Sequence, residues 1–203
     1  MEYTVTIQGQ ELAFATTPGI FSPRRADEGT LAMLSCAALS PGDTLLDLGC
    51  GCGIVGVWAA RTLGAGNVWM CDVDPEAVRI ARENAARNGV GGVTCVVSDA
   101  YEGVDRAGFQ WILCNPPYQT DFSVAKRFIE KGFNRLALGG QMLMVTKRRL
   151  WYENKLKTVF GGVRTREIGG YFVFTAVRRS WDSPRFRPRE TGKKGGSPGR
   201  GDT

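Results

Sequence analysis

The sequence predicts an α/β fold with a Rossmann-like, doubly wound sheet of seven mostly parallel strands. Three features support this fold class. Short apolar runs alternate with helix-like segments from residue 44 onward, which is typical of parallel strands joined by helices on both faces of a sheet. A glycine-rich loop over residues 49–53 follows the first of these strands. Only Gly169-Gly170 separates the last two strands, so we expect an antiparallel C-terminal hairpin.

The N-terminal segment predicts a short β-hairpin. Residues 3–14 alternate apolar and polar around Gln8-Gly9, which suits a two-residue hairpin turn. A loop follows, and Asp27 is a residue type that caps helices, so a helix is expected over residues 28–39. We therefore expect a hairpin and loop over residues 1–26, ahead of the main domain.

Strands and helices then alternate along the chain. The strands are short apolar or β-branched runs, expected over residues 44–48, 67–71, 93–97, 109–114 and 141–146. The helices are expected over residues 54–63, 75–88, 122–138 and 151–160. Pro75 is a residue type that favours the first position of a helix, and Gly89 is one that favours the position just past a helix end. Gly139-Gly140 is expected to end the helix over residues 122–138.

Two aromatic and β-branched runs, at residues 163–168 and 171–177, close the main domain, which we expect to span residues 27–180. Residues 181–203 are rich in Arg, Pro, Gly, Lys and Ser, which predicts a disordered tail. The formal net charge of the chain is +6. Much of it lies in the tail, where a basic arm beginning at Arg178 is expected to contact a polyanion such as RNA and to gain order there.

The composition is that of a folded globular protein. The chain has 203 residues, 43% hydrophobic and 23% charged, which fits one domain and excludes a wholly disordered chain. The sequence contains no apolar run of about 18 residues, so no transmembrane helix is expected. The first residues lack the basic start and apolar stretch of a signal peptide. We therefore expect a cytoplasmic protein with no membrane contact.

Histidine is absent, and the cysteines do not follow a metal-binding pattern. The absence of histidine excludes Ser-His-Asp triads and His-ligated metals. No C-x-x-C pair is present, so no zinc ribbon, thioredoxin-like site or other metal site is expected. Reduced thiols in apolar runs agree with a cytoplasmic location. The six cysteines are Cys36, Cys50, Cys52, Cys71, Cys95 and Cys114.

A cofactor pocket is predicted at the carboxyl ends of the first three parallel strands. Glycines let a loop approach a ligand closely, and the following helix N-terminus offers free N–H groups. Asp72 ends the next strand, where a carboxylate can accept both ribose hydroxyls, and Asp99 follows the third, placed to accept from adenine N6. In the first loop the candidate residues are Asp47, Gly49, Gly51 and Gly53.

Two adenosine-containing cofactors fit this pattern. Gly51-x-Gly53-x-x-Gly56, with Asp72 farther along, satisfies the dinucleotide fingerprint of nicotinamide enzymes. The form Asp-x-Gly-x-Gly-x-Gly, with the acid at the end of the strand, is similar to the first motif of S-adenosylmethionine methyltransferases. The loop then holds the amino-acid part of the cofactor. An empty strand-to-helix turn is the third alternative.

Asn115-Pro116-Pro117-Tyr118 follows the fourth parallel strand and favours the methyl donor. The prolines impose an extended backbone and leave carbonyl groups free to accept hydrogen bonds. Together with the Asn115 amide oxygen, they can hold both hydrogens of an NH2 group and aim its lone pair at a methyl group. Tyr118 offers a face on which a planar base can stack. The candidate catalytic residues are therefore Asn115, Pro116 and Tyr118.

Residues 10–178 resemble the small-domain family of S-adenosylmethionine-dependent methyltransferases, which includes guanine-N2 enzymes of small-subunit ribosomal RNA. The resemblance is carried by residues 18–22, 27–30, 46–53, 71–74, 84–89 and 115–118. It implies that Asp72 holds the ribose, with Val73 beside it, and that Asp99 holds the adenine amine, with Ala100 beside it. It also implies that Gly49 and Gly51 hold the methionine end of the cofactor, and that Phe21 and Thr30 close the pocket.

The expected function is methyl transfer to an exocyclic amine of a base in RNA, with guanine N2 of small-subunit rRNA favoured. Adenine-N6 enzymes and release-factor glutamine methyltransferases carry the same Asn-Pro-Pro-Tyr signature and are the alternatives. A nicotinamide oxidoreductase and a non-catalytic RNA-binding module are more remote. The best-known family member has two tandem domains, whereas this sequence predicts one, so recognition would use its hairpin, its tail or a partner.

Basic residues near the predicted pocket are candidates for RNA contact. Lys147, Arg148 and Arg149 follow the fifth parallel strand, at the same edge as the pocket. Arg24 and Arg25 lie in the loop before the first helix. Phosphate groups account for much of the affinity in nucleic-acid binding, so we expect these side chains to contact the RNA backbone. A solvated basic surface is the alternative.

Overall fold

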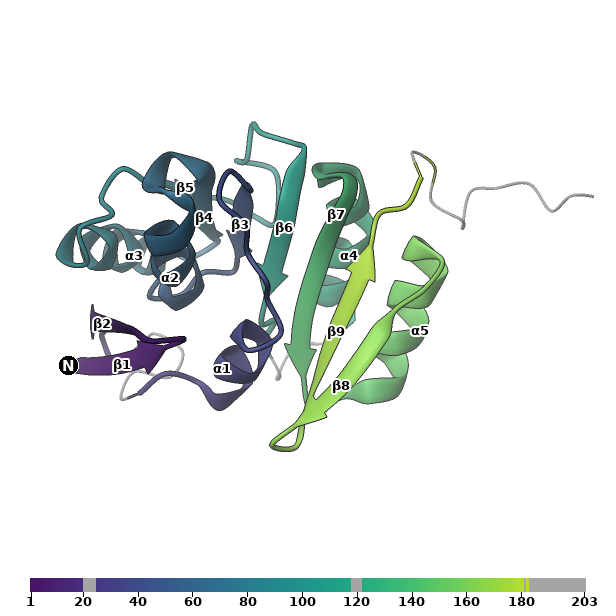
Figure 1. Ribbon diagram of the computed structural model, residues 1–203, viewed down its shortest axis with the longest axis horizontal. Coiled ribbons are helices and arrows are strands. Elements are labelled where there is room, and N and C mark those ends of the chain that lie inside the picture. The colour runs from purple at the N-terminus through teal and green to yellow at the C-terminus, as the bar shows by residue number, and fades with distance from the viewer. Residues whose placement is uncertain (20–24, 118–121, 181, 183–203) are drawn as a thin grey trace, which may run out of the picture.

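The computed structural model describes residues 1–19, 25–117, 122–180 and 182. Within these residues a seven-stranded sheet has the strand order β5-β4-β3-β6-β7-β9-β8 (Figure 1). Strands β3 to β7 pair in parallel, whereas β9 is antiparallel to β7 and β8. The strands are β3 (Leu45–Leu48), β4 (Val68–Asp72), β5 (Thr94–Val97), β6 (Phe109–Cys114), β7 (Leu136–Thr146), β8 (Arg164–Ile168) and β9 (Tyr171–Val177). The predicted fold class is confirmed.

Helices cover both faces of this sheet and define two cores. Successive residues in a strand point to opposite faces, so Leu45 packs with α1, α2 and α3, and Leu46 with α4 and α5. No helix in the described part of the chain is long and apolar enough to cross a membrane. The helices are α1 (Glu28–Leu34), α2 (Ile54–Leu63), α3 (Pro75–Arg87), α4 (Phe122–Arg135) and α5 (Arg149–Phe160), with a 3₁₀ turn at Ala65–Asn67.

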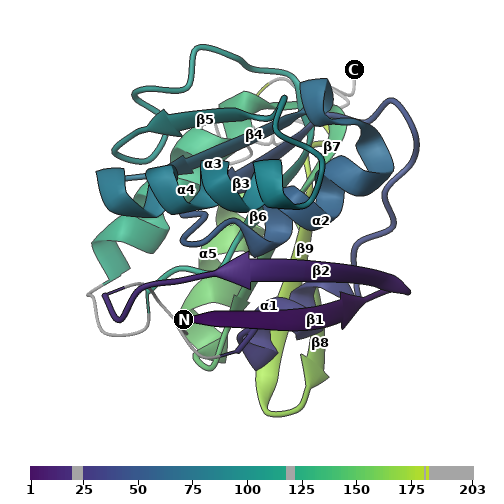
Figure 2. The same ribbon diagram turned by 90° about the vertical axis from the view of Figure 1, so that its left-hand side faces the viewer.

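The predicted N-terminal hairpin forms a separate two-stranded sheet beside α3 (Figure 2). It consists of β1 (Glu2–Ile7) and β2 (Gln10–Ala15), which pair in antiparallel fashion. Gln8 and Gly9 connect them with φ angles of 47° and 80°. Both residues are left-handed, as the favoured two-residue hairpin turns require.

Asn84 of α3 and Asn88, the residue that caps the C-terminus of this helix, bind the hairpin through hydrogen bonds. Asn84 accepts a hydrogen bond from the Ala15 N–H at 2.8 Å and donates to the Ala15 carbonyl at 2.8 Å. Asn88, one helical turn later, makes the same pair of bonds to Ala13, at 3.0 and 2.7 Å. The two side-chain amides therefore bind the backbone N–H and C=O groups at one edge of β2, as a neighbouring strand would. Asn84 also donates to the Cys52 carbonyl at 2.9 Å, which ties the hairpin to the glycine loop.

Replacing Asn84 with alanine is expected to destabilise the fold by about 2 kcal/mol, because buried backbone groups lose their partners. The Asn84 side chain is fully buried. Urea unfolding followed by circular dichroism measures the change. Asn154→Ala, at an exposed position of α5, is the matched control and should stay within about 0.5 kcal/mol of the wild type. Equal stabilities of the two variants would contradict this role for Asn84.

The boundary between α4 and β7 differs from the predicted one. The helix was expected to continue to residue 138, but it ends at Arg135, and β7 begins at Leu136. Leu136 is buried and pairs with Phe109, so pairing with β6 overrides the local helical pattern. Gly140 lies in the resulting bulge, where a Cβ would come within 2.6 Å of the Phe109 carbonyl oxygen. α1 is also shorter than expected and ends at Leu34.

Arg178 belongs to this bulge and not to a basic arm. Its side chain is buried, and Nη1 donates to the Leu136 carbonyl at 2.6 Å. Its backbone N–H donates to the Gly140 carbonyl at 2.9 Å, and its carbonyl accepts from the Gly139 N–H at 2.7 Å. The expected start of the RNA-binding arm at Arg178 is therefore corrected. Apart from Asp182, the tail predicted over residues 181–203 lies outside the described residues.

Candidate active site

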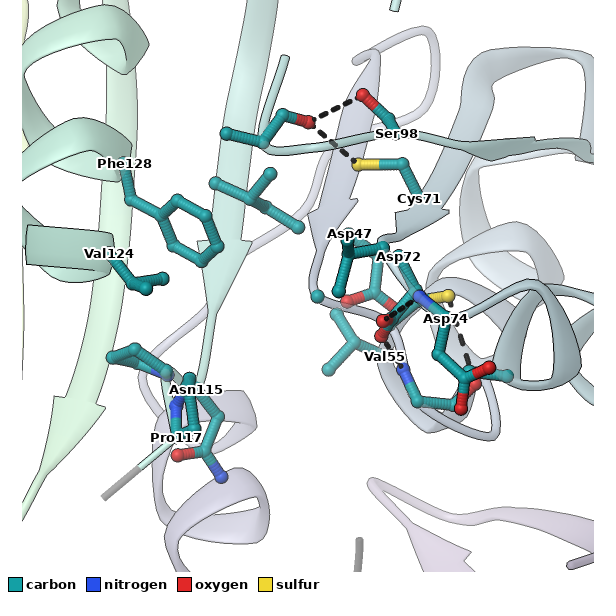
Figure 3. A pocket seen from close by; sticks show the side chains of 18 of the residues that line it. Asp47, Val55, Cys71, Asp72, Asp74, Ser98, Asn115, Pro117, Val124 and Phe128 are labelled. Carbon is teal, nitrogen blue, oxygen red and sulfur yellow. Dashed lines mark hydrogen bonds between the residues drawn. The ribbon is translucent and has the colours of Figure 1, made fainter. Parts of the chain in front are cut away.

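A cavity of about 430 Å³ opens where β3, β4 and β6 end (Figure 3). Several candidate residues that are far apart in the sequence meet in its lining. They are Thr30, Asp47, Gly49, Gly51, Asp72, Val73, Asp99, Ala100, Asn115 and Pro116. Three further candidates, Phe21, Arg24 and Tyr118, lie outside the described residues.

The glycine loop leaves open space beside its backbone. Gly49 and Gly51 have φ angles of 76° and 53°, which favour glycine. A Cβ on Gly51 would meet no atom within 4 Å, and one on Gly49 would meet only Phe128, at 3.9 Å. Gly53 is the N-cap of α2 and is not among the residues that line the cavity. A Cβ there would lie 3.1 Å from Ala81 of α3, so glycine at this position allows the two helices to pack closely. The loop can therefore admit a ligand close to its main chain.

Asp47 is an almost fully buried carboxyl group at the base of the cavity. Its Oδ2 atom accepts a hydrogen bond from the Gly56 N–H at 2.9 Å. Burial, assisted by the nearby charge of Asp72, raises the pKa of Asp47 to about 7, and the Gly56 bond only partly opposes this. Near neutral pH this carboxyl group is therefore partly protonated.

The contribution of Asp47 to stability is expected to fall as pH rises from about 4 to 7. The unfolded chain ionises Asp47 near its ordinary pKa of 3.8, whereas the folded protein holds the proton up to about pH 7. Across this window the folded state holds more of the proton on Asp47, so the contribution of this residue to the free energy of unfolding decreases by at least about 1 kcal/mol and then levels off. Unfolding of wild type and Asp47→Asn at several pH values tests this. Parallel pH profiles for the two proteins would contradict the raised pKa.

Asp72 connects the end of β4 to the glycine loop. One carboxylate oxygen accepts from the Gly51 N–H at 2.9 Å, and the other accepts from the Asp74 N–H at 3.1 Å. Val73, beside it, is 65% exposed although it is apolar, and it also lines the cavity. The segment therefore presents a carboxylate next to an open apolar surface, which suits a ribose joined to a planar base.

The residues after β5 form a fixed turn that brings Asp99 to the cavity. Ala100 has the left-handed φ of 55°, and its carbonyl accepts from the Ser98 hydroxyl at 2.8 Å and the Cys71 thiol at 3.6 Å. Asp99 forms a bidentate ion pair with Arg127 of α4, in which Nη1 donates to Oδ2 at 2.7 Å. Each carboxylate oxygen has two lone pairs, so Asp99 retains acceptor capacity toward a ligand.

Asn115 lies just after β6, and its amide is held from one side. Nδ2 donates to Asp27 Oδ2 at 2.8 Å and to Thr30 Oγ1 at 3.0 Å. Oδ1 is buried and has no hydrogen-bond partner among the described residues. A buried acceptor without a hydrogen-bond partner costs free energy. Oδ1 is therefore a candidate acceptor for a donor group of a bound molecule.

The wall formed by α4 is a part of the site that sequence reasoning missed. Val124, Arg127 and Phe128 line the cavity, and Figure 3 shows Val124 and Phe128 across it from Asp47 and Asp72. Their spacing of three and four residues is the helical signal that could have found them. Asp27 was expected only as a helix cap, and its bond to Asn115 was also missed.

The four basic candidates that the structure describes, Arg25, Lys147, Arg148 and Arg149, are not among the residues that line the cavity. Arg25 is exposed and pairs with Glu28 at 3.4 Å. After β7, the charged groups of three exposed residues lie over aromatic rings: Lys147 over Tyr171 at 4.8 Å, Arg148 over Phe122 at 5.4 Å and Arg149 over Phe172 at 5.8 Å. Because β6 and β7 are parallel neighbours, this basic segment and Asn115 are at the same edge of the sheet.

The cavity is acidic, and its thiols are not nucleophilic. Among its described lining residues are five carboxyl groups and one guanidinium group, so it favours a cationic ligand. Burial raises the pKa of the Cys50, Cys52 and Cys71 thiols, so they remain protonated and apolar. All six cysteines are free. The described residues contain no cluster of three acidic or cysteine side chains suited to a metal ion.

The chain belongs to the methyltransferase small domain family, which it matches over residues 11–175. Two curated relatives are proteins named ribosomal RNA small subunit methyltransferase C. The protein of Pseudomonas aeruginosa strain LESB58 is 32% identical over 182 residues, which are 88% of this chain and 54% of the relative. The protein of Pseudomonas putida strain F1 is 31% identical over 183 residues, 87% of this chain and 54% of the relative. The chain therefore spans about half the length of these relatives.

Two solved structures are similar in fold. A Thermus thermophilus 16S rRNA N2 methyltransferase (RsmC), in complex with AdoMet and guanosine, superposes with a TM-score of 0.81 at 28% identity. The match covers 88% of this chain and 50% of that chain. TrmN from Thermus thermophilus has a TM-score of 0.61 at 26% identity, over 72% of this chain and 46% of that chain.

Proposed function

We propose that this protein is an S-adenosylmethionine-dependent methyltransferase that acts on guanine N2 of small-subunit ribosomal RNA in the cytoplasm. The observation that carries the proposal is the buried Oδ1 of Asn115, which has no hydrogen-bond partner in the described part of the chain and belongs to a residue that lines an acidic cavity. An exocyclic amine supplies the missing donor. The relatives named as rRNA small subunit methyltransferases, and the similar structure that binds AdoMet and guanosine, support the same acceptor.

The residues of the cavity fit S-adenosylmethionine. This molecule carries a positive sulfonium and an ammonium group, which suit an acidic lining. Asp72 is suited to the ribose, Val73 to one face of the adenine, and Asp99 to the adenine amine. The open main chain at Gly49 and Gly51 is suited to the methionine end, near the carboxyl group of Asp47.

The residues of this chain contribute positioning and polarisation. Asn115 Oδ1 and the backbone carbonyl of Pro116 accept the two hydrogens of the amine and orient its lone pair. As the nitrogen attacks, it gains positive charge, which strengthens both hydrogen bonds in the transition state. Bound S-adenosylmethionine would supply the methyl group, with its sulfur keeping the electron pair of the broken carbon–sulfur bond, and the methylated nitrogen would lose a proton to solvent.

Mass mapping of rRNA modification in cells with and without this protein tests the proposal. N2-methylguanosine is expected to disappear from one position of small-subunit rRNA on deletion and to return with the wild-type gene, but not with Asn115→Ala. In vitro, tritium from labelled S-adenosylmethionine should enter RNA. Label in a release factor, in adenine N6, or in no RNA would overturn the assignment to guanine.

The basic segment after β7 is proposed to contact RNA phosphates. Replacing both Lys147 and Arg148 with alanine should weaken RNA binding and reduce the slope of log K against log salt by about 0.7 per lost contact. Binding titrations at several salt concentrations measure that slope. Arg61→Ala is the matched control. α2 starts beyond the carboxyl end of β3 and runs back along the sheet, so its last turn, which contains Arg61, lies near the amino ends of the strands. An unchanged slope in the double variant would remove this segment from the RNA interface.

A further inference from the structure

Asp27 links the first turn of α1 to the side chain of Asn115. Its Oδ2 atom caps the helix by accepting from the Thr30 N–H at 2.8 Å. The same oxygen accepts from Asn115 Nδ2 at 2.8 Å and from the Thr30 hydroxyl at 3.4 Å. One carboxylate oxygen thus joins two segments that are 88 residues apart.

These contacts decide which end of the Asn115 amide faces the ligand. The oxygen and nitrogen of an amide are similar in size, so packing alone does not distinguish them. The two hydrogens on Nδ2 meet two acceptors, Asp27 Oδ2 and Thr30 Oγ1. A flipped amide would set Oδ1 against the Asp27 carboxylate with no proton between them. It would also present a donor, Nδ2, to the amine that is to be bound.

Close packing holds Asp27 in this position. Gly29 follows the cap, and a Cβ there would lie 2.7 Å from the Tyr171 ring of β9 and 2.9 Å from Asp27 Oδ2. Because residue 29 has no side chain, the first turn of α1 can lie directly against that ring. Farther along α1, Met33 and Leu34 are fully buried. The carboxylate is therefore anchored to the sheet that carries Asn115.

We propose that Asp27 is a positioning residue that locks the Asn115 amide with its oxygen toward the acceptor amine. This inference rests on the proposed N-methyltransferase function. In this role Asp27 acts through Asn115 and does not touch the reacting atoms. Its charge also polarises the Asn115 amide, because hydrogen bonds in a chain strengthen one another.

Two substitutions separate this role from helix capping. Asp27→Ser keeps a good N-cap, since serine and aspartate cap helices about equally well, but its side chain is too short to reach Asn115. Asp27→Asn keeps both the cap and an acceptor oxygen for Nδ2. The single-turnover rate at saturating cofactor and RNA should fall about 10–30-fold in Asp27→Ser, and Asp27→Asn should recover most of it. Cofactor affinity and thermal midpoints of both variants should stay near those of the wild type.

A double-mutant cycle with Asn115→Ala tests whether Asp27 works through Asn115. Asp27→Ser should change the rate less than about twofold when Asn115 is already alanine, because the group that it positions is gone. Equal fractional losses in both backgrounds would overturn the proposal, as would equal rates of Asp27→Ser and Asp27→Asn. A fall in thermal midpoint that accounts for the whole loss in Asp27→Ser would also overturn it.

Hydrogen exchange of the Asn115 side-chain NH2 group tests the locking of the amide without any measurement of methyl transfer. The Asn115 side-chain NH2 signals in a ¹⁵N NMR spectrum are identified by their loss in Asn115→Ala. They should exchange slowly with water in the wild type and in Asp27→Asn, and at least tenfold faster in Asp27→Ser. Equal exchange in all three proteins overturns the locking of the amide whatever the substrate. A wild type that methylates no RNA guanine instead overturns the proposed function.

Discussion

Replacing Asn115 with alanine is expected to lower the single-turnover rate of methyl transfer about 10²–10³-fold, the typical loss for one transition-state hydrogen bond. The amine nitrogen becomes positively charged only as it attacks, so the bond to Oδ1 is stronger in the transition state than in the bound substrate. The loss should therefore appear in the rate of the chemical step. Rapid-quench measurements with tritiated S-adenosylmethionine and saturating RNA give that rate directly.

Cofactor binding should be nearly unaffected by the same change, because Asn115 contacts α1 and not the glycine loop. Isothermal calorimetry with S-adenosylmethionine checks this point. Asn134→Ala, at an exposed position of α4, is the matched substitution and should have wild-type activity. A near-normal single-turnover rate in Asn115→Ala would exclude the amide from the reaction.

Much of the fold could be predicted from the sequence because its central strands are largely buried. Leu45, Leu46 and Leu48 of β3 are almost inaccessible to solvent, and such short apolar runs between helices indicate a parallel sheet. The boundary between α4 and β7 could not be predicted in this way. There the chain follows long-range contacts, namely the pairing of Leu136 with Phe109 and the bonds made by Arg178.

The candidate site could be predicted where its residues lie at the carboxyl ends of parallel strands, because these ends meet at one edge of the sheet. Asp47 and Asp72 lie near or at the carboxyl ends of β3 and β4, and Asn115 directly follows β6, so topology alone brings them to one edge. The ion pair between Asp99 and Arg127 joins the turn after β5 to α4, and no local pattern specifies it. The same holds for Asp27, whose bond to Asn115 depends on how α1 packs against the sheet.

Replacing Asp72 with alanine is expected to weaken S-adenosylmethionine binding about 10²-fold, since two hydrogen bonds to a charged acceptor are lost, each worth about 1.5 kcal/mol. The structure adds a second reason, because the same carboxylate holds the Gly51 N–H at 2.9 Å and so fixes the loop on which the methionine end is proposed to rest. Calorimetric titration of the purified protein measures the affinity.

Asp72→Asn separates these two contributions. The asparagine oxygen can still accept from Gly51, so the loop keeps its shape, but one acceptor for the ribose hydroxyls becomes a donor. We expect an intermediate loss of about tenfold, the effect of one such bond. Asp105→Ala, an exposed acid outside the cavity, should bind like the wild type. If Asp72→Ala also binds like the wild type, the ribose is held elsewhere, and the orientation proposed for the cofactor is wrong.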